Sequence, residues 1–373
     1  MSFFKKLFSK KEDEIYNNED FWNWFSQNEK QFFNTVKKKA NLEKDFFNKL
    51  SPKLDKVKTG IFFVTGMFDD NTVELIFSAD GNIKTITFIE DLVLAAPAIT
   101  GWKFTCLKQP LRVEDVSITM ADYNFNKHNI YFYYEMETSF PDEISITIVH
   151  NDYNEENKTA IINGCYIFLD NFIGELNFVT TIDNVDFIEK QNAKEKLIPI
   201  EKLKDYLIWR EKEFVEKYEG KKYNIENDGH SVIEGVAENG APIVAIINTE
   251  ILEWDSKASH PWVVCVEIKY DGKNNNGLPD NKSMAFFEKL QNEIEDILQA
   301  QDGYLSIGRE TSNDVREIYF ACKDFRKPSK VLYATINKHK QDVQMDFSIY
   351  KDKYWRTFDR FTNIASEEEM DED

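Results

Sequence analysis

The sequence has 373 residues, enough for two domains that each bury a core, and 42% of the residues are hydrophobic, which excludes a disordered chain. The formal net charge of −20 argues against duplex nucleic acid or an anionic membrane as a general partner, because phosphate binding depends on clustered Lys and Arg. No apolar run approaches the ~18 residues of a spanning helix. Residues 1–8 are too short and too often interrupted by lysine for a signal peptide. We therefore expect a cytoplasmic protein without integral membrane association.

The first predicted domain covers residues 17–189 and follows a flexible, basic and aromatic segment over residues 1–16. Helices are expected where apolar residues recur at three- and four-residue steps, and strands where the period is two. The predicted helices cover residues 18–36, 43–54, 89–96 and 159–172. The predicted strands cover residues 61–68, 73–80, 83–88, 102–108, 117–125, 130–137, 143–150 and 175–188. This pattern predicts helices packed on one antiparallel sheet.

A polar linker with a bridging helix is expected over residues 190–219, and the helix itself over 201–218. The second predicted domain, 220–365, opens with two strands around a turn over residues 231–248. An acidic tail, 366–373, ends the chain, with six carboxylates in its last eight residues. The sequence does not say which domain the bridging helix packs against.

The most legible part of the second domain has the order β-α-β-β-α-β. Its strands are predicted over residues 262–270, 304–310, 315–323 and 343–352. Its first helix has apolar residues at helical spacing from Met284 to Leu298, and its second has Val331, Leu332 and Ile336 on one side. This order is typical of the ferredoxin-like split arrangement, with two helices on one face of an antiparallel sheet. The predicted fold class is α+β in both domains.

The sequence contains no motif of a familiar catalytic or metal site. Four widely spaced cysteines lack a C-x-x-C pair, and the five histidines lack zinc spacing, so the cysteines are expected to be buried, reduced thiols. No phosphate-binding loop, dinucleotide signature or hydrolase signature occurs. We predict no catalytic residues, no metal ion and no cofactor.

One polar cluster, around the turn at residues 312–314, supplies the candidate binding residues. Together with two residues near the carboxyl end they are Arg309, Thr311, Arg316, Glu317, Tyr319, Asp352 and Trp355. Strand alternation places Arg316 with Ile318, and Glu317 with Tyr319 on the other face. Two interpretations of Arg316 stay open: a semi-buried arginine paired with Asp352 or a glutamate, or an anchor for a carboxylate.

The face that the two helices leave uncovered is predicted to be solvated, paired with the first domain or used for binding. Tyr319, Glu317 and Arg309 are expected to form an exposed, mixed aromatic and charged patch there, of the kind that is enriched at interface centres. Trp355, after Asp352, is expected to hold the carboxyl-terminal segment on the sheet.

Several of these residues carry a family resemblance. An Asp-Gly…Gly-Leu-Pro turn runs from Asp271 to Pro279, Thr311 and the Arg316-Glu317 pair follow, and Asp352-x-x-Trp355 ends the pattern. The last third of the chain thereby resembles a bacterial family of unknown function, the one numbered 695, and departs from it at Asp314, where the family often has Gly. The ending is also similar to that of the regulators of ribonuclease E activity B, which bind and inhibit that enzyme. The resemblance implies an α+β fold and brings no established catalytic residues.

Two functions from different classes follow. The first is an acidic, cytoplasmic bacterial protein that binds and regulates another protein without catalysis. The alternative is a hydrolase or transferase with an unfamiliar site of carboxylates and arginines at the domain junction.

Overall fold

The computed structural model describes residues 17–362, so the predicted flexible segment 1–16 and the acidic tail 366–373 lie outside the described residues. The fold is α+β, which confirms the predicted class. Within the described residues the chain forms two compact units: unit 1 comprises residues 17–130 and 152–180, and unit 2 comprises 131–151 and 181–362. The predicted domain limits, 17–189 and 220–365, stay predictions. Between residues 17 and 362, no helix has both the length and the apolar character that crossing a bilayer requires.

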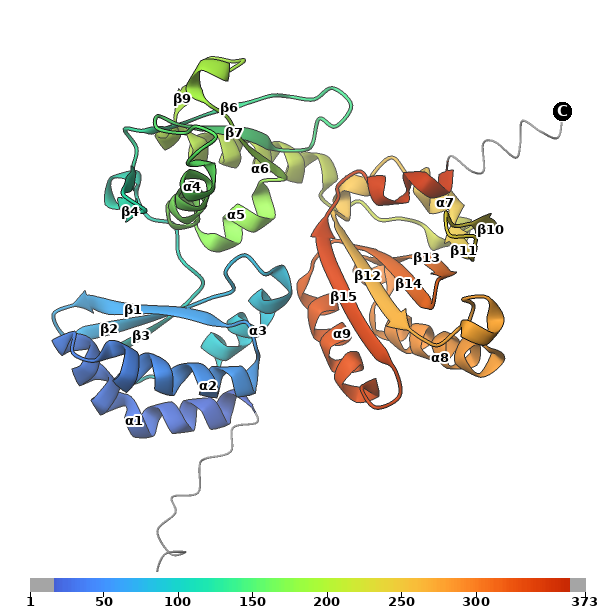
Figure 1. The fold of residues 1–373 in the computed structure, drawn as a ribbon, viewed down its shortest axis with the longest axis horizontal. Coiled ribbons are helices and arrows are strands. Elements are labelled where there is room, and N and C mark those ends of the chain that lie inside the picture. Colours follow the sequence, from blue (N-terminus) through green and yellow to red (C-terminus); the bar gives the residue numbers. More distant parts are fainter. Residues whose placement is uncertain (1–16, 363–373) are drawn as a thin grey trace, which may run out of the picture. The chain divides into compact units, whose positions relative to one another are not determined.

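Unit 1 contains a three-stranded sheet in the order β1-β2-β3 (Figure 1). Its elements are α1 (Asn18–Lys38), a π-helical turn (Glu43–Phe47), α2 (Asn48–Val57), β1 (Phe62–Asp69), β2 (Thr72–Ser78), α3 (Ile83–Leu94), β3 (Trp102–Cys106), the hairpin of β4 (Ile118–Met120) and β5 (Tyr123–Phe125), α4 (Lys158–Ile173) and α5 (Glu175–Thr181). Aromatic residues on one side of α1 pack on this sheet. The ring of Phe25, for example, lies 4.9 Å from that of Trp102. The aromatic spacing that predicts α1 therefore also fixes what it buries.

Two predicted strands of this region are wrong. Residues 83–88 belong to α3, because the Asn82 side chain accepts a hydrogen bond from the Lys84 N–H and so caps a helix, and Ile86 and Ile89 share its buried side. The pairing of β2 with β3 is parallel, and a parallel pair needs such a crossover helix. Residues 175–181 form α5, and only residues 184–187 of the predicted strand 175–188 are extended.

The prediction of one antiparallel sheet over residues 17–189 is also wrong. Unit 2 holds a second, four-stranded sheet in the order β8-β7-β6-β9. Its strands are β6 (Ile130–Tyr134), β7 (Ser145–His150), β8 (Asn184–Phe187) and β9 (Ile198–Pro199). The pairing of β7 with β8 is parallel, so both sheets are mixed. The bridging helix follows as α6 (Leu203–Tyr218), and its Arg210 donates to the backbone oxygens of Pro141 and Glu143 in unit 2.

The largest sheet has six strands in the order β10-β11-β13-β14-β12-β15, with every neighbouring pair antiparallel. The strands are β10 (His230–Val236), β11 (Pro242–Asn248), β12 (Trp262–Lys269), β13 (Tyr304–Ser312), β14 (Val315–Cys322) and β15 (Gln344–Lys351). The last four have the order of a split β-α-β-β-α-β arrangement. Strands β10 and β11 extend the sheet beyond β13.

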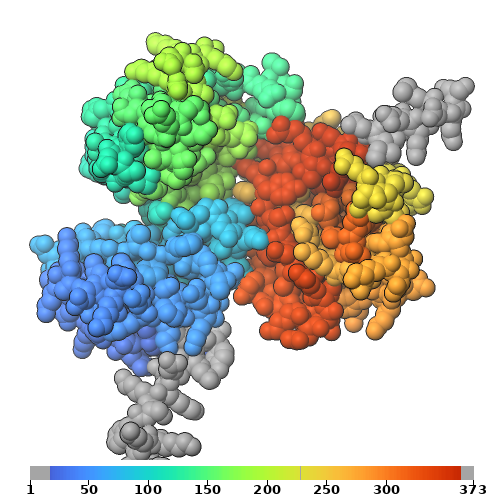
Figure 2. Space-filling view, in the orientation of Figure 1, coloured from blue at the N-terminus to red at the C-terminus, as the bar shows by residue number. Residues whose placement is uncertain are grey.

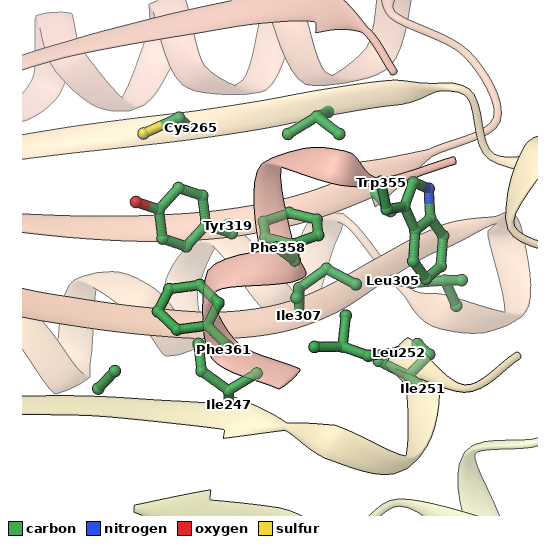
Figure 3. Packing of buried hydrophobic residues seen from close by; sticks show 13 residues of the cluster. Ile247, Ile251, Leu252, Cys265, Leu305, Ile307, Tyr319, Trp355, Phe358 and Phe361 are labelled. Atoms are coloured by element: carbon green, nitrogen blue, oxygen red, sulfur yellow. The ribbon is translucent and has the colours of Figure 1, made fainter. Parts of the chain in front are cut away.

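Helices α8 (Asn281–Ile297) and α9 (Arg326–His339) lie on one face of this sheet, the helix face (Figure 1). The opposite face is covered by the short helix α7 (Thr249–Leu252) and by the C-terminal segment, residues 355–362. Trp355, Phe358 and Phe361 of this segment pack on buried side chains of the strands (Figure 3). We call this second face the sealed face.

The turn between β13 and β14 fixes the ends of both strands. Asn313 and Asp314 have φ values of 49° and 65°, the pattern of a two-residue hairpin turn with both central residues left-handed. Asp314 also holds the loop after β12, because its Oδ1 accepts from the Gly272 N–H at 2.7 Å and its own N–H donates to the Gly277 carbonyl. A Cβ on Gly272 would lie 2.6 Å from the Gly277 carbonyl carbon, so this close approach explains the Asp-Gly…Gly turn.

Candidate functional site

The seven predicted binding residues all lie in unit 2, but the structure divides them into three groups. The helix face carries Arg309, Thr311 and Arg316, and the sealed face carries Glu317 and Tyr319. Asp352 precedes the C-terminal segment, and Trp355 begins it. A single patch made of these residues therefore does not form.

Tyr319 is a core residue with 2% of its surface exposed. Its ring lies 5.5 Å from that of Phe358 and 6.3 Å from that of Phe361 (Figure 3). Its hydroxyl donates to Glu317 Oε2 at 2.5 Å and accepts from Arg360 Nη2 at 2.6 Å. Burial and the Glu317 hydrogen bond raise the pKa of Tyr319 far above its ordinary value. The predicted exposed patch is wrong, because Tyr319 is covered and Arg309 lies on the opposite face.

Sequence reasoning missed Arg360, which completes the polar cluster of the sealed face. Its Nη2 lies 3.3 Å from Glu310 Oε2 and 4.0 Å from Glu317 Oε2. Glu310 and Glu317 are directly opposite each other on β13 and β14, where like charges are destabilising. Burial raises the pKa of Glu310, while Arg360 opposes that shift. Arg360 therefore stabilises two facing carboxylates, a role that the register of the hairpin could have indicated.

Asp352 and Trp355 fix the start of the C-terminal segment. Asp352 Oδ2 accepts from the Thr357 N–H and hydroxyl, so the carboxylate closes the turn that follows. Trp355 is 1% exposed, and its Nε1 donates to the His260 carbonyl at 2.9 Å. The expectation that Trp355 holds this segment on the sheet is confirmed. Burial lowers the pKa of His260 to about 4, so its ring is neutral near pH 7.

A second group of charges in unit 2 is fully paired. Asp183 accepts from Lys351 Nζ at 2.9 Å and from Lys353 Nζ at 2.8 Å, and all three side chains are about nine-tenths buried or more. Burial lowers the pKa of Lys351 to about 8, against the attraction of Asp183. Glu143 accepts from Arg356 at 2.7 Å beside this group. These contacts attach the end of β15 and the C-terminal segment to Glu143 and Asp183 of the same unit, which is a structural role.

Arg316 on the helix face is buried and forms no ion pair within 4.0 Å among the described residues, and the charge of Glu288 only opposes the lowering of its pKa by burial. It is 2% exposed, its Nε donates to Thr311 Oγ1 at 3.0 Å, and its Nη2 contacts the Met284 sulfur at 3.0 Å. Its guanidinium carbon lies 5.3 Å from the centre of the Phe287 ring. Its Nη1 has no hydrogen-bond partner. The predicted pairing of Arg316 with Asp352 or a glutamate is therefore wrong.

Arg309 lies on the same face at the mouth of a cavity. Its Nη1 donates to Gln291 Oε1 at 3.3 Å, and Gln291 donates onward to Glu295 Oε1 at 2.8 Å, which also accepts from the Ser306 hydroxyl. The cavity has a volume of about 330 Å³, and its lining consists of His230, Ile246, Glu288, Gln291, Asn292, Glu295, Ser306, Gly308 and Arg309. Within residues 17–362, no carboxylate oxygen lies within 4.0 Å of either Arg309 or Arg316.

In the described part of the chain, no three His, Cys, Asp or Glu side chains come together as metal ligands. The four cysteines are free thiols, and three of them are buried.

Comparison with known proteins gives one result. Residues 236–362 match the model of a family of unknown function (DUF695). This region runs from the end of β10 to the C-terminal segment. It therefore includes both arginines of the helix face and the polar cluster of the sealed face. The chain matches no curated protein and no solved structure.

Proposed function

We propose that this chain is a non-catalytic module of the bacterial cytoplasm that binds another protein and regulates it, and that the partner docks on the edge strand β10. The single observation that carries the proposal is this edge. No described strand pairs with the outer side of β10, which has seven residues and neither proline nor lysine. Proteins commonly protect such edges with those residues, because a free edge is a template for another strand.

The side chains of β10 favour a partner there. Val232 is 64% exposed and Val236 is 73% exposed, and both are on the same side of the strand. Figure 2 shows the β10–β11 hairpin, in yellow, at the surface of the molecule. An extended segment can pair with β10 through its backbone while its alternate side chains contact the two valines. The opposite edge strand, β15, carries Lys351 and is held by Asp183.

The charge around β10 indicates the chemistry of the partner. Residues 223–256 contain no Lys or Arg, and they contain seven carboxylates. We therefore propose a basic, extended segment of another protein as the occupant, because opposite charge increases the rate of encounter and disfavours acidic competitors.

The test is affinity capture with the full chain, followed by identification of the retained proteins at low and high salt. The variant Val232→Lys with Val236→Lys protects the edge with charges and should lose partners that the parent retains. Ile208→Lys is the matched control, since Ile208 is 65% exposed on α6 and has no place in the proposed interface. Partners lost from the edge variant and retained by the control support the proposal. Retention of the same proteins by all three chains, or of none by the parent, overturns it.

The alternative function, a hydrolase or transferase, stays a prediction of the sequence.

A further inference from the structure

Two arginines of neighbouring strands lie together on the helix face. Arg309 of β13 is directly opposite Ile318, and Arg316 of β14 is directly opposite Thr311. The two arginines are therefore diagonal neighbours, whose Cα atoms are roughly 7–8 Å apart in such a pair. Their charges interact, because Arg309 contributes to lowering the pKa of Arg316 to about 10, after burial itself. Two repelling cations in a chain of net charge −20 need an explanation.

The contacts of Arg316 leave its charge poorly satisfied. A hydroxyl and a thioether are its hydrogen-bond acceptors, and a thioether is a weak one. Nη1 makes no hydrogen bond, although Arg316 is 98% buried. Burying a cation without an anion is unfavourable, and an anion that reached this guanidinium would relieve the cost.

The cavity beside Arg309 restricts the kind of anion. Asn292 and Gln291 contribute amides to its wall, but Glu288 and Glu295 line it as well. Glu295 already accepts from Ser306 and Gln291, so it is occupied. Two nearby carboxylates disfavour a multiply charged anion such as phosphate. A singly charged anion is repelled less by these two carboxylates than a multiply charged one, so it suits the site better.

We propose that Arg309 and Arg316 bind one carboxylate group, which enters through the cavity beside α8. The planar fork of each guanidinium suits the two oxygens of a carboxylate. Met284 is unbranched and adaptable, so its sulfur can yield its place at Nη2 to a carboxylate oxygen. Phe287 and Met284 provide apolar contacts for the carbon that bears the carboxylate. This site does not depend on the proposed docking at β10, because the carboxylate can belong to a small organic acid or to a protein.

The test uses the full chain with sodium acetate or sodium phosphate, against sodium chloride at matched ionic strength. Thermal unfolding should show a rise in Tm of about 2–4 °C at ten times the Kd of a bound carboxylate. Calorimetric titration should show an affinity that falls about tenfold or more in Arg316→Met and in Arg309→Gln. Arg112→Gln is the matched control, because Arg112 is exposed and already paired with Asp115.

A peptide of four alanines with a free terminal carboxylate, compared with its amide, separates the two sources. A response to acetate assigns the site to small acids, and a response to the acid peptide alone assigns it to a protein carboxylate; either supports the site. If phosphate raises the Tm of the chain more than the carboxylates do, the proposal that the ligand is a carboxylate is wrong. The absence of any response in the parent, or an equal response in Arg316→Met and Arg309→Gln, overturns the site itself.

Discussion

On the sealed face of the six-stranded sheet, Arg360 contacts two carboxylates and a tyrosine hydroxyl. On the helix face, the hydrogen-bond acceptors of Arg316 are a threonine hydroxyl and a thioether. The two arginines belong to the same sheet and differ in what surrounds them. Arg360 remains half exposed, and Arg316 is buried.

On the sealed face, the charges of Arg360 and the two glutamates are paired with one another. On the helix face, no carboxylate of the described residues contacts the guanidinium of Arg316. A buried charge is tolerated when it is paired and hydrogen-bonded, so the polar cluster of the sealed face requires no ligand. Within residues 17–362, no carboxylate contacts either arginine of the helix face, so an anion that reached them would stabilise the buried charge of Arg316. Four predictions test this contrast, from the largest expected effect to the smallest.

Trp355→Ala should have the largest effect on the sealed face. The change removes a side chain that is 1% exposed and a hydrogen bond to the His260 carbonyl, and it should lower the free energy of unfolding by about 3–5 kcal/mol. Urea denaturation measures it. Trp209→Ala is the control, because Trp209 is 46% exposed and should cost less than about 1 kcal/mol. Equal losses in the two variants would contradict a sealed core at Trp355.

The ring of His260, beside Trp355, should make stability depend on pH. Its pKa is about 4 in the folded chain and about 6.5 in the unfolded chain, so the unfolded state binds more protons between these values. The free energy of unfolding should therefore rise as the pH rises from about 4 to 6.5, by ~2 kcal/mol, and then level off.

Comparison with His260→Asn isolates this contribution. The raised pKa values of Glu143 and Glu310 act in the opposite sense, but they do so in both proteins. Denaturation across this pH range should show a steeper rise in the parent than in the variant. Parallel curves would show that burial of His260 does not control the slope.

Tyr319→Phe should have a moderate effect. The change removes the hydroxyl between Glu317 and Arg360 and leaves the ring packing intact, so it should cost about 1–2 kcal/mol. Tyr304→Phe is the control, because no group within residues 17–362 hydrogen-bonds the Tyr304 hydroxyl, and its change should stay within about 0.5 kcal/mol. A loss in the control as large as that in Tyr319→Phe would assign the effect to the ring.

The same substitution on the two faces should differ in sign. Arg316→Met, measured without added carboxylate, should leave stability unchanged or raise it by up to ~1–2 kcal/mol, because it replaces a buried unpaired charge by an apolar side chain of similar length. Arg360→Met should lower stability by about 1 kcal/mol, because Arg360 is half exposed and its loss leaves Glu310 and Glu317 facing each other unneutralised. Chemical denaturation of both variants compares them, and equal losses would show that Arg316 is satisfied.

Alternation along β14 predicted which face each of its residues occupies, and the structure agrees: Arg316 and Ile318 share one face, and Glu317 and Tyr319 share the other. The same rule could not place Arg309. The pairing of β13 with β14 shifts between Ser306 and Gly308, so residues before and after this bulge follow opposite alternations. Only the register set by the two-residue turn at 313–314 locates Arg309 opposite Ile318.

Other differences come from tertiary contacts. Residues 83–88 contain β-branched residues that favour a strand, but the cap at Asn82 and the parallel pairing of β2 with β3 override that preference. The sequence contains a weak signal that the C-terminal segment packs on another surface, because Phe358 and Phe361 are three residues apart, as on one turn of a helix. Local spacing alone could not show which surface they cover.

The position of the sealing residues also determines when this domain can finish folding during synthesis. Its core spans residues 245–361, and the three side chains that complete it, Trp355, Phe358 and Phe361, are the last of that range to be made. Until they emerge, the side chains of Leu305, Ile307 and Tyr319 present an apolar surface. Chains that stop short of Trp355 would keep that surface exposed and would be open to aggregation and proteolysis.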